Sequence, residues 1–294
     1  MHDIPGEYTY TECRNCGLVF INPQPSPKEI SRHYPKGYYS FGISDMKFKR
    51  FQIFLYKTYF SDEDNRNIFL RAVFMPFRRI LRTIKIVEDG KFLDVGCGSG
   101  DFLQIPKELG FECYGVEPGN FDAKSAKKRG FRIFHGTLRE AGYKEDFFDV
   151  ITLNHVFEHM DDPSGTLKEL KRILKKDGMI RIAVPQKRSL AYWIFGRYWV
   201  QLDAPRHFFI YSESTLRTYA KKSGLKVSSV RYVSSPFQFT QSVIYWAKDK
   251  DLRWLGRIFE TKIAFLILFP LSFACNRLHI GDSIEIILSK EMDK

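Results

Sequence analysis

FLDVGCGSG, residues 92–100, is the stretch of this sequence that decides the fold. The segment KFLDV at 91–95 predicts a β-strand that leads directly into a turn. Every second residue of that turn is a glycine: Gly96, Gly98 and Gly100. Because glycine has no Cβ, such a turn can bend sharply and approach a ligand closely. A helix predicted over 100–109 would place its N-terminus behind the loop, where anionic groups bind.

The following residues suit a nucleoside ligand. Asp94, at the end of the predicted strand, can accept a hydrogen bond from an ammonium group or from backbone N–H groups. Glu117 follows the next predicted strand, 111–116, and an acid there can bind both hydroxyls of a ribose. After the third predicted strand, the backbone near Leu138 can cover a purine ring. A ligand with an amine, a carboxylate, a ribose and an adenine fits these residues, and S-adenosylmethionine has all four groups. The alternative is a loop that binds a nicotinamide dinucleotide, or a tight turn that binds no ligand.

Strand and helix patterns alternate through the middle of the chain. Short apolar and β-branched runs predict strands at 91–95, 111–116, 131–135, 147–154, 179–185, 225–232 and 283–289. Amphipathic segments predict helices at 100–109, 120–129, 163–175 and 212–222. Strands joined by helices of this length form parallel sheets with right-handed crossovers. The sequence therefore predicts a doubly wound α/β sheet.

Two regions precede this pattern and one interrupts it. Residues 1–45 are rich in proline and turn residues, which predicts a small irregular lobe. Residues 46–88 carry Phe, Ile and Leu at helical spacing with a break near Ser61, which predicts two helices. Residues 89–294 then form the nucleoside-binding domain, with an apolar helical insertion at 233–282 before the last strand.

Composition and charge limit the class of protein. A chain of 294 residues with 44% hydrophobic and 27% charged residues is ordinary for a globular protein and excludes a disordered or collagenous one. Its net charge of +12 suits an anionic partner, whether nucleic acid, a phosphorylated small molecule or a membrane surface. The first residues lack an apolar signal, and the five cysteines are an odd number, so a reduced, cytoplasmic chain is expected.

With these motifs the chain resembles the class I S-adenosylmethionine-dependent methyltransferases over roughly residues 90–232. Besides the glycine loop and Glu117, the resemblance rests on FFDVITLNHVFEHMDDP at 147–163 and DAPRHFFIYSESTLR at 203–217. Within that class the chain is most similar to the branch that includes quinone-ring O-methyltransferases and the methyltransferases of saccharide and natural-product clusters. The resemblance implies a Rossmann-like sheet of seven strands whose last strand, 283–289, is antiparallel.

The resemblance also implies roles by motif position. The cofactor-binding positions are Asp94, Gly96, Gly98 and Gly100 for methionine and its loop, Glu117 for ribose, Leu138 for adenine and Asn154 near the sulfonium. Many relatives have an acidic residue near the adenine amine after the third strand. Here Thr137-Leu138-Arg139 occupies that place, which leaves the adenine contact to the backbone.

Three histidines are the catalytic candidates: His155, His159 and His207. Methyl transfer from a sulfonium needs the nucleophile and the methyl group in line at about 3 Å, with water excluded. A hydroxyl nucleophile also has to lose its proton to a nearby histidine or carboxylate. We expect His207 to act either as this base or as a positioning residue.

The spacing around Glu158 leaves a metal site open. If 155–159 is helical, His155, Glu158 and His159 share one face. With His207 they could hold a divalent ion, an arrangement that resembles some quinone and small-RNA terminal-ribose methyltransferases. Alternatively, Glu158 and His159 cap and pack the start of a helix. We expect no metal at this site.

Two further features remain outside this scheme. Cys13 and Cys16 resemble half of a zinc ribbon, but a structural zinc site needs four ligands, so zinc binding stays open. The segment 252–280 is too apolar for a loop, and its run at 263–275 is too short to span a bilayer. This segment can form a buried lid over the substrate, or a peripheral contact with a membrane or a second copy.

The sequence thus predicts a methyltransferase that uses S-adenosylmethionine to modify a hydroxyl of a small molecule, such as a saccharide or a lipid-linked precursor. A quinone-ring O-methyltransferase is one alternative. A nucleic-acid methyltransferase is another, supported by the net charge, although the sequence contains no RNA-binding module and no specific nucleic-acid partner is expected. A protein that binds the cofactor without chemistry is the last alternative. The oligomeric state is not predicted.

Overall fold

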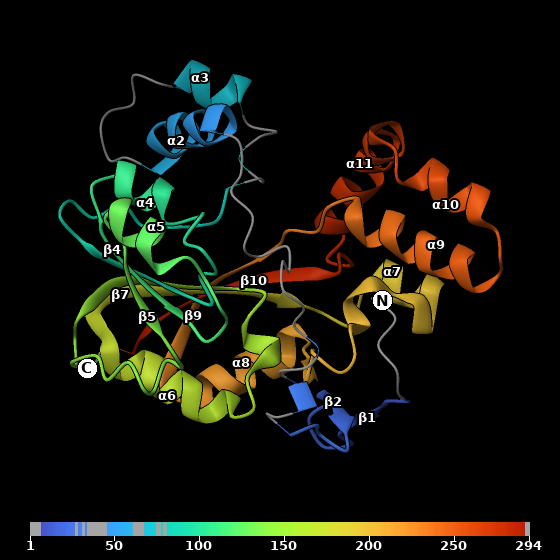
Figure 1. Cartoon of the computed structure of the whole chain (residues 1–294), viewed down its shortest axis with the longest axis horizontal. Helices are drawn as coiled ribbons and strands as arrows, with labels where there is room; N and C mark the ends of the chain where they lie inside the picture. Colours follow the sequence, from blue (N-terminus) through green and yellow to red (C-terminus); the bar gives the residue numbers. More distant parts are fainter. Residues whose placement is uncertain are drawn as a thin grey trace.

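The computed structural model describes residues 7–26, 29–30, 33, 46–60, 68–74, 78 and 81–291. A seven-stranded sheet with the order β5-β4-β3-β6-β7-β10-β9 forms its centre (Figure 1). The strands are β3 (Lys91–Val95), β4 (Glu112–Glu117), β5 (Arg132–His135), β6 (Phe148–Asn154), β7 (Leu174–Pro185), β9 (Leu225–Tyr232) and β10 (Ser283–Lys290). Only β10 runs antiparallel to its neighbours, β7 and β9. The predicted fold class is confirmed.

Helices cover both faces of this sheet. On one face lie α4 (Gln104–Glu108), α5 (Ala123–Lys128) and α2 (Met46–Phe60), and on the other lie α6 (Pro163–Ile173) and α8 (Glu213–Lys222) (Figure 1). The central strands are therefore buried on both sides, which is why the segments FLDV (92–95) and VITL (150–153) are mostly apolar and not alternately polar. One hydrophobic cluster includes Leu93, Ile151 and Leu170, and a second includes Phe92, Phe111 and Val150.

The parallel strands end at one common edge of the sheet. Register pairs Asp94 with Thr152, and Val95 with both Val116 and Leu153. Strand β10 begins at this edge, because its first residue, Ser283, pairs with Pro185 at the end of β7. Open α/β sheets bind their ligands at this carboxyl edge.

The N-terminal lobe is more regular than predicted. Strands β1 (Thr9–Glu12) and β2 (Val19–Asn22) form an antiparallel hairpin, and β8 (Phe209–Ile210) adds a third strand. The prediction of an irregular lobe is therefore wrong for residues 9–22. The third strand comes from a point almost 190 residues away in sequence, so no local pattern reveals the pairing. The predicted lobe residues 34–45 lie outside the described part of the chain.

The region 46–88 is only partly helical. Helices α2 and α3 (Ile68–Val73) match the two predicted helices, while the predicted break near Ser61 lies outside the described residues. Residues 82–87, which carry the same helical spacing, are not helical. The hydroxyl of Thr83 donates to Glu285 on β10 (2.5 Å), and Lys85 N donates to the sulfur of Met179 on β7 (3.0 Å). Contacts with the sheet therefore override the local helical pattern.

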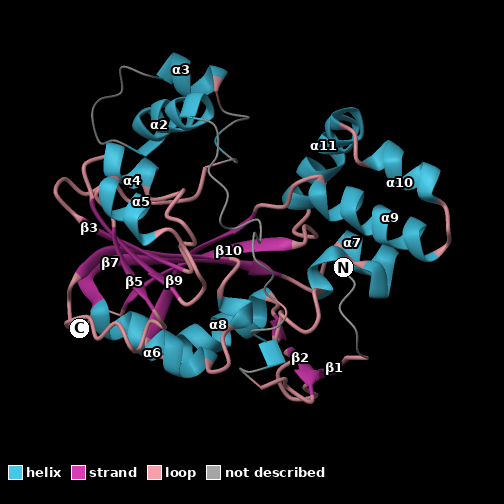
Figure 2. Cartoon of the chain, viewed as in Figure 1, coloured by secondary structure: helices cyan, strands magenta, loops and turns pink. Residues whose placement is uncertain are grey.

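The predicted helical insertion is confirmed. It consists of α9 (Phe237–Asp249), α10 (Arg253–Phe259) and α11 (Lys262–Arg277), which stand together beyond the end of the sheet where β10 begins (Figure 2). Between β7 and β8 the chain forms α7 (Leu190–Phe195) and the short 3-10 turns η5 (Gly196–Tyr198) and η6 (Val200–Leu202), which contact α9.

Candidate functional site

The glycine loop takes a backbone conformation that favours glycine. Gly96, Gly98 and Gly100 have φ values of +69°, +54° and +75°. A Cβ on Gly96 would lie 2.4 Å from Cγ2 of Val156, which belongs to the turn after β6. The absent side chain therefore brings the loop after β3 and the turn after β6 into contact.

Gly100 serves packing in this structure. A Cβ there would lie 3.0 Å from Phe131 and 3.1 Å from Ile133, on the side of β5. The helix predicted from residue 100 begins only at Gln104 and has five residues. The expected helix N-terminus directly behind Gly100 is therefore wrong, because the left-handed Gly100 and the following turn residues delay the helix.

Asp94 is buried at the end of β3. Its Oδ1 accepts a hydrogen bond from the hydroxyl of Thr152 at 2.6 Å and lies 3.9 Å from Nη1 of Arg82. Burial raises the pKa of Asp94, and the charge of Arg82 and the Thr152 hydrogen bond oppose this rise. The guanidinium of Arg82 also lies 3.7 Å from the centre of the Phe102 ring, just beyond the glycine loop.

Glu117 ties the end of β4 to the glycine loop. Its Oε2 accepts a hydrogen bond from Gly98 N at 2.8 Å, and its Oε1 accepts one from Gly119 N at 2.7 Å. Each carboxylate oxygen has a second lone pair, so both can still accept from a ribose diol. The structure thus brings the predicted ribose acid to the predicted loop.

The two remaining predicted cofactor residues have other contacts in this structure. The side chain of Leu138 is 7% exposed and packs in the hydrophobic core, so only its backbone is left for a purine ring. Asn154 Oδ1 accepts a hydrogen bond from Nη1 of Arg181 at 3.1 Å. Their predicted cofactor contacts remain predictions.

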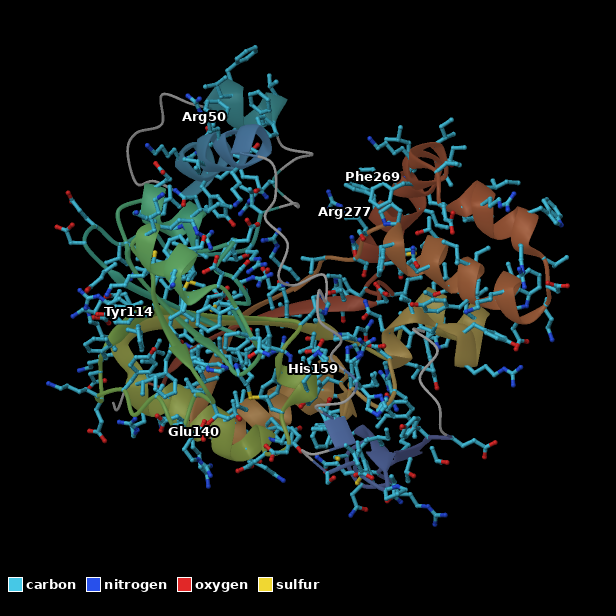
Figure 3. All side chains as sticks on the ribbon, in the orientation of Figure 1. Arg50, Tyr114, Glu140, His159, Phe269 and Arg277 are labelled. Atoms are coloured by element: carbon cyan, nitrogen blue, oxygen red, sulfur yellow. The ribbon has the colours of Figure 1, made fainter. Side chains whose placement is uncertain are left out.

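The candidate catalytic residues meet around Glu158. His155 follows β6 with φ +54°, and its Nδ1 lies 3.2 Å from Oε1 of Glu158. Only η4 (Phe157–His159) is helical here, a single 3-10 turn, so the helix over 155–159 on which the shared face depended does not form. The loop after η6 nevertheless brings Nε2 of His207 to 3.9 Å from the same Glu158 oxygen (Figure 3 labels His159 in this region).

Hydrogen bonds set the tautomers of two of these histidines. Nδ1 of His159 lies 2.8 Å from the carbonyl oxygen of Arg206, and Nδ1 of His207 lies 2.7 Å from that of Gln201. Because a carbonyl oxygen only accepts, both Nδ1 atoms carry the proton. Each neutral ring then has its lone pair on Nε2. The two rings lie edge to face, with centroids 4.7 Å apart.

A model of the "Methyltransferase domain" family matches residues 67–230, more than half of the chain. The chain belongs to this family. S-adenosylmethionine is the cofactor of such methyltransferases, and the residues present fit it. The loop carries no side chains at Gly96, Gly98 and Gly100, Asp94 is a buried acceptor for an ammonium, and Glu117 offers two acceptors to a diol.

Curated relatives match part of this methyltransferase domain. An uncharacterized protein of Methanocaldococcus jannaschii is 30% identical over 103 residues, which are 35% of this chain and 48% of that protein. A demethylmenaquinone methyltransferase of Staphylococcus saprophyticus is 28% identical over 111 residues, again 35% and 48%. The match thus spans about half the length of these relatives.

Solved structures share the fold. A complex of the Haloferax volcanii Trm112 methyltransferase activator with a methyltransferase has a TM-score of 0.51 at 14% identity, covering 75% of this chain and 89% of that one. The [4+2]-cyclase SpnF also has a TM-score of 0.51, at 16% identity, covering 80% and 86%. Since one of these is named a cyclase, the fold alone does not specify methyl transfer.

We call Glu158 and the three histidines around it, His155, His159 and His207, the histidine cluster. The pKa values of Glu158 and His159 in this cluster are shifted. Burial would raise the pKa of Glu158, but the hydrogen bond and charge of His155 and the charges of His159 and His207 hold it below its usual value. Burial and the charge of His207 lower the pKa of His159 to about 4. Oε2 of Glu158 is buried without a hydrogen-bond partner in the described structure.

Three of these residues also form a set of metal-ligand type. Glu158, His159 and His207 each offer one ligand atom, and these atoms lie within 4.8 Å of one another. One carboxylate and two imidazoles suit a divalent transition metal. His155, which the sequence analysis placed in the same set, contacts Glu158 from outside it. The expectation of no metal stays a prediction.

Sequence reasoning missed Asp282, which supports this cluster. Asp282 is buried just before β10, and its Oδ2 lies 3.4 Å from Nε1 of Trp199 and 3.5 Å from Nε2 of Gln201, which donate to it. Burial raises the pKa of Asp282 to about 6. The residue follows the insertion and reaches the site only because β10 is antiparallel, so no local motif marks it.

Cys13 and Cys16 lie in the turn between β1 and β2. Gly17 N donates to Cys13 O, and Cys13 N donates to Leu18 O, both at 2.8 Å. Hydrogen bonds from the backbone of Cys16 and Asn15 lower the pKa of the Cys13 thiol. The turn favours a thiolate, but zinc binding remains a prediction.

Proposed function

We propose that this methyltransferase domain transfers a methyl group from S-adenosylmethionine to a hydroxyl of a small molecule, a saccharide or a lipid-linked precursor. The observation that carries the proposal is the contact between Gly96 and Val156. This contact joins the glycine loop to the turn that bears His155 and Glu158. Cofactor loop and proton acceptors therefore lie at one edge of the sheet.

The chain's own residues hold the cofactor and orient it. When bound, S-adenosylmethionine supplies a methyl group on a sulfonium, which an in-line nucleophile can accept. Asp94 accepts from the ammonium of the methionine part, and Glu117 accepts from the ribose hydroxyls. Glu117 also accepts a hydrogen bond from Gly98 N. The same carboxylate therefore binds the ribose and holds the glycine loop in place.

His207 takes the proton of the acceptor hydroxyl. Its Nδ1–H is held by the Gln201 carbonyl, so Nε2 carries the lone pair. After proton uptake the imidazolium lies 3.9 Å from Glu158 Oε1 and 3.9 Å from Asp203 Oδ2, and both carboxylates stabilise it. His155, whose Nδ1 lies 3.2 Å from the same Oε1, positions that carboxylate.

A quinone-ring acceptor is the second candidate. It is supported by the likeness to a protein named demethylmenaquinone methyltransferase, which covers about a third of this chain. A phenolic acceptor would use the same base. A nucleic-acid acceptor is supported only by the net charge of +12.

The test is turnover to S-adenosylhomocysteine against a panel of nucleotide sugars, lipid-linked saccharides and phenols. We expect His207→Ala to lower kcat by about 10²- to 10⁴-fold, with the affinity for S-adenosylmethionine unchanged. The control is His279→Asn, since His279 stacks on Tyr232 away from the cluster. Full turnover by His207→Ala would remove the base role.

Treatment with a chelator distinguishes general-base catalysis by His207 from catalysis by a bound metal ion. We expect EDTA-treated enzyme to keep its activity. If EDTA abolishes turnover and Mg²⁺ or Zn²⁺ restores it, the Glu158, His159 and His207 set holds an ion that activates the hydroxyl, and our assignment of His207 as the base is wrong.

A further inference from the structure

Helix α11 exposes its large apolar residues and buries small or polar ones, the reverse of what is expected of a helix on the surface of a water-soluble protein. Its buried residues are small or polar: Ala264, Ser272, Cys275 and Asn276. Its exposed residues are large and apolar: Ile263, Phe265, Leu266, Ile267, Phe269, Leu271 and Phe273. Leu266 and Ile267 are 69% and 70% exposed. A helix packed against a water-soluble core normally shows the reverse pattern.

Neighbouring residues add to this surface. Trp254 and Ile258 on α10 are 63% and 51% exposed, and Leu278 directly after α11 is 68% exposed. We call these residues, together with the exposed apolar residues of α11, the apolar face. Large exposed apolar surfaces mark sites of contact with a membrane or another protein.

The charge around the apolar face selects an anionic partner. Four exposed basic residues flank it: Arg253, Arg257, Lys262 and Arg277. Glu260 is the single acidic residue in the sequence between 252 and 280, and Asp251, just before this range, pairs with Arg253 (Oδ1 to Nε, 3.4 Å), so Arg257, Lys262 and Arg277 carry most of the positive charge. The guanidinium of Arg277 lies 5.6 Å from the centre of the Phe273 ring, and Figure 3 labels Phe269 and Arg277 on α11. A second copy would bring like charges together, which disfavours self-association through this face.

The geometry of the two helices suits a surface contact. Among the described residues, no single helix is long and apolar enough to cross a membrane; α10 and α11 reach that length and apolarity only as a pair, bent by 69°. A short apolar helix with basic margins lies in the interface of a bilayer, with its apolar side chains below the headgroups.

We propose that the apolar face docks this domain on an anionic lipid bilayer. Trp254 and the large side chains of α11 enter the headgroup region, and the basic residues bind lipid phosphates. This inference concerns a surface separate from the catalytic residues, and it does not rest on the proposed reaction.

The docking surface is connected to the candidate site. Helix α11 packs on α9, and Ser242 of α9 accepts a hydrogen bond from Val200 N of η6 at 3.1 Å. The next residue, Gln201, holds Nδ1 of His207. These contacts link the helix that bears the apolar face to the loop that holds His207.

Vesicle flotation with the full chain tests the proposal. We expect binding to vesicles of phosphatidylcholine with about 30% phosphatidylglycerol at least tenfold tighter than to phosphatidylcholine alone, and weaker at high salt. Leu266→Gln with Ile267→Gln should lose at least tenfold of this binding. Arg253→Gln with Arg257→Gln should lose the preference for anionic lipid.

The matched control changes exposed apolar residues elsewhere. Phe69 and Val73 on α3 are 77% and 50% exposed, so Phe69→Gln with Val73→Gln should bind vesicles like the unchanged chain. Cofactor binding by each variant reports that it is folded. The proposal is overturned if the unchanged chain does not float with anionic vesicles, if the control loses as much binding, or if the face instead mediates a dimer that Leu266→Gln with Ile267→Gln dissociates.

Discussion

Because Gly96 has no side chain, the glycine loop packs directly against Val156, in the turn that bears the candidate catalytic residues. The loop after β3 and the turn after β6 belong to adjacent strands, and a Cβ at Gly96 would overlap Val156. The glycine pattern was readable from the sequence, but its contact with Val156 was not, because it depends on strand order. The same holds for Gly98 and Glu117, 19 residues apart yet joined by a hydrogen bond.

His159 makes folding stability depend on pH. Its pKa is about 4 in the folded chain and about 6.5 when unfolded, so between these values the unfolded state binds more protons. Stability contributed by the neutral ring is therefore present above pH 6.5 and is lost as the pH falls toward 4. The loss is at most about 3 kcal/mol, because one pKa unit corresponds to about 1.4 kcal/mol.

Urea unfolding between pH 4 and 7 measures this effect as a difference between the unchanged chain and His159→Gln. We expect the fall in unfolding free energy on acidification to be smaller in the variant. Asp282 titrates in both proteins, so its contribution largely cancels, whereas Glu158, whose pKa the charge of His159 helps to lower, is part of the measured difference. Equal slopes in the two proteins would contradict the lowered pKa of His159.

Strands β7 and β10 are joined by a buried ion pair. Nε of Arg181 donates to Oε2 of Glu285 at 2.6 Å, and Arg231 on β9 lies 3.4 Å from the other carboxylate oxygen. Burial would raise the pKa of Glu285, but the charges of Arg181 and Arg231 keep it below its usual value. Three strands thus depend on one carboxylate.

Glu285→Gln leaves Arg181 buried without its counter-charge. We expect the free energy of unfolding to fall by about 3 kcal/mol, since removing one partner of a buried pair is strongly destabilising. The matched control is Glu169→Gln, whose partner Arg172 lies on the more exposed α6 and whose loss should cost less than about 1 kcal/mol. Similar losses in both variants, measured by denaturant unfolding, would refute the role of the buried pair.

Helices and strands could be predicted from the sequence where the local pattern of apolar residues agrees with the tertiary contacts. The strand at 91–95 matches β3, and the strands at 225–232 and 283–289 match β9 and β10 within one residue. Residues 82–87 carry a helical pattern, but the contacts of Thr83 with Glu285 and of Lys85 with Met179 keep this segment out of a helix. The β1–β2 hairpin also needs a distant partner, β8, which no window of sequence contains.

At the scale of the whole molecule, the carboxyl edge of the sheet brings together site residues that lie far apart in the sequence. Glycine loop, Glu117 and the histidine cluster come from four separate segments, and sequence motifs identified each of them. Asp282 and Gln201 were not identified, because their roles arise from the insertion packing on η6. The apolar insertion was visible as composition, whereas only the structure shows that its large side chains face outward.

Isothermal titration calorimetry with S-adenosylmethionine tests the central claim most directly. We predict one binding site in the unchanged chain, at least tenfold weaker binding in Glu117→Ala, and unchanged binding in Glu112→Ala, which alters the far end of the same strand. NAD should give no heat. An absence of heat with S-adenosylmethionine, together with NAD binding that Glu117→Ala abolishes, would contradict the account.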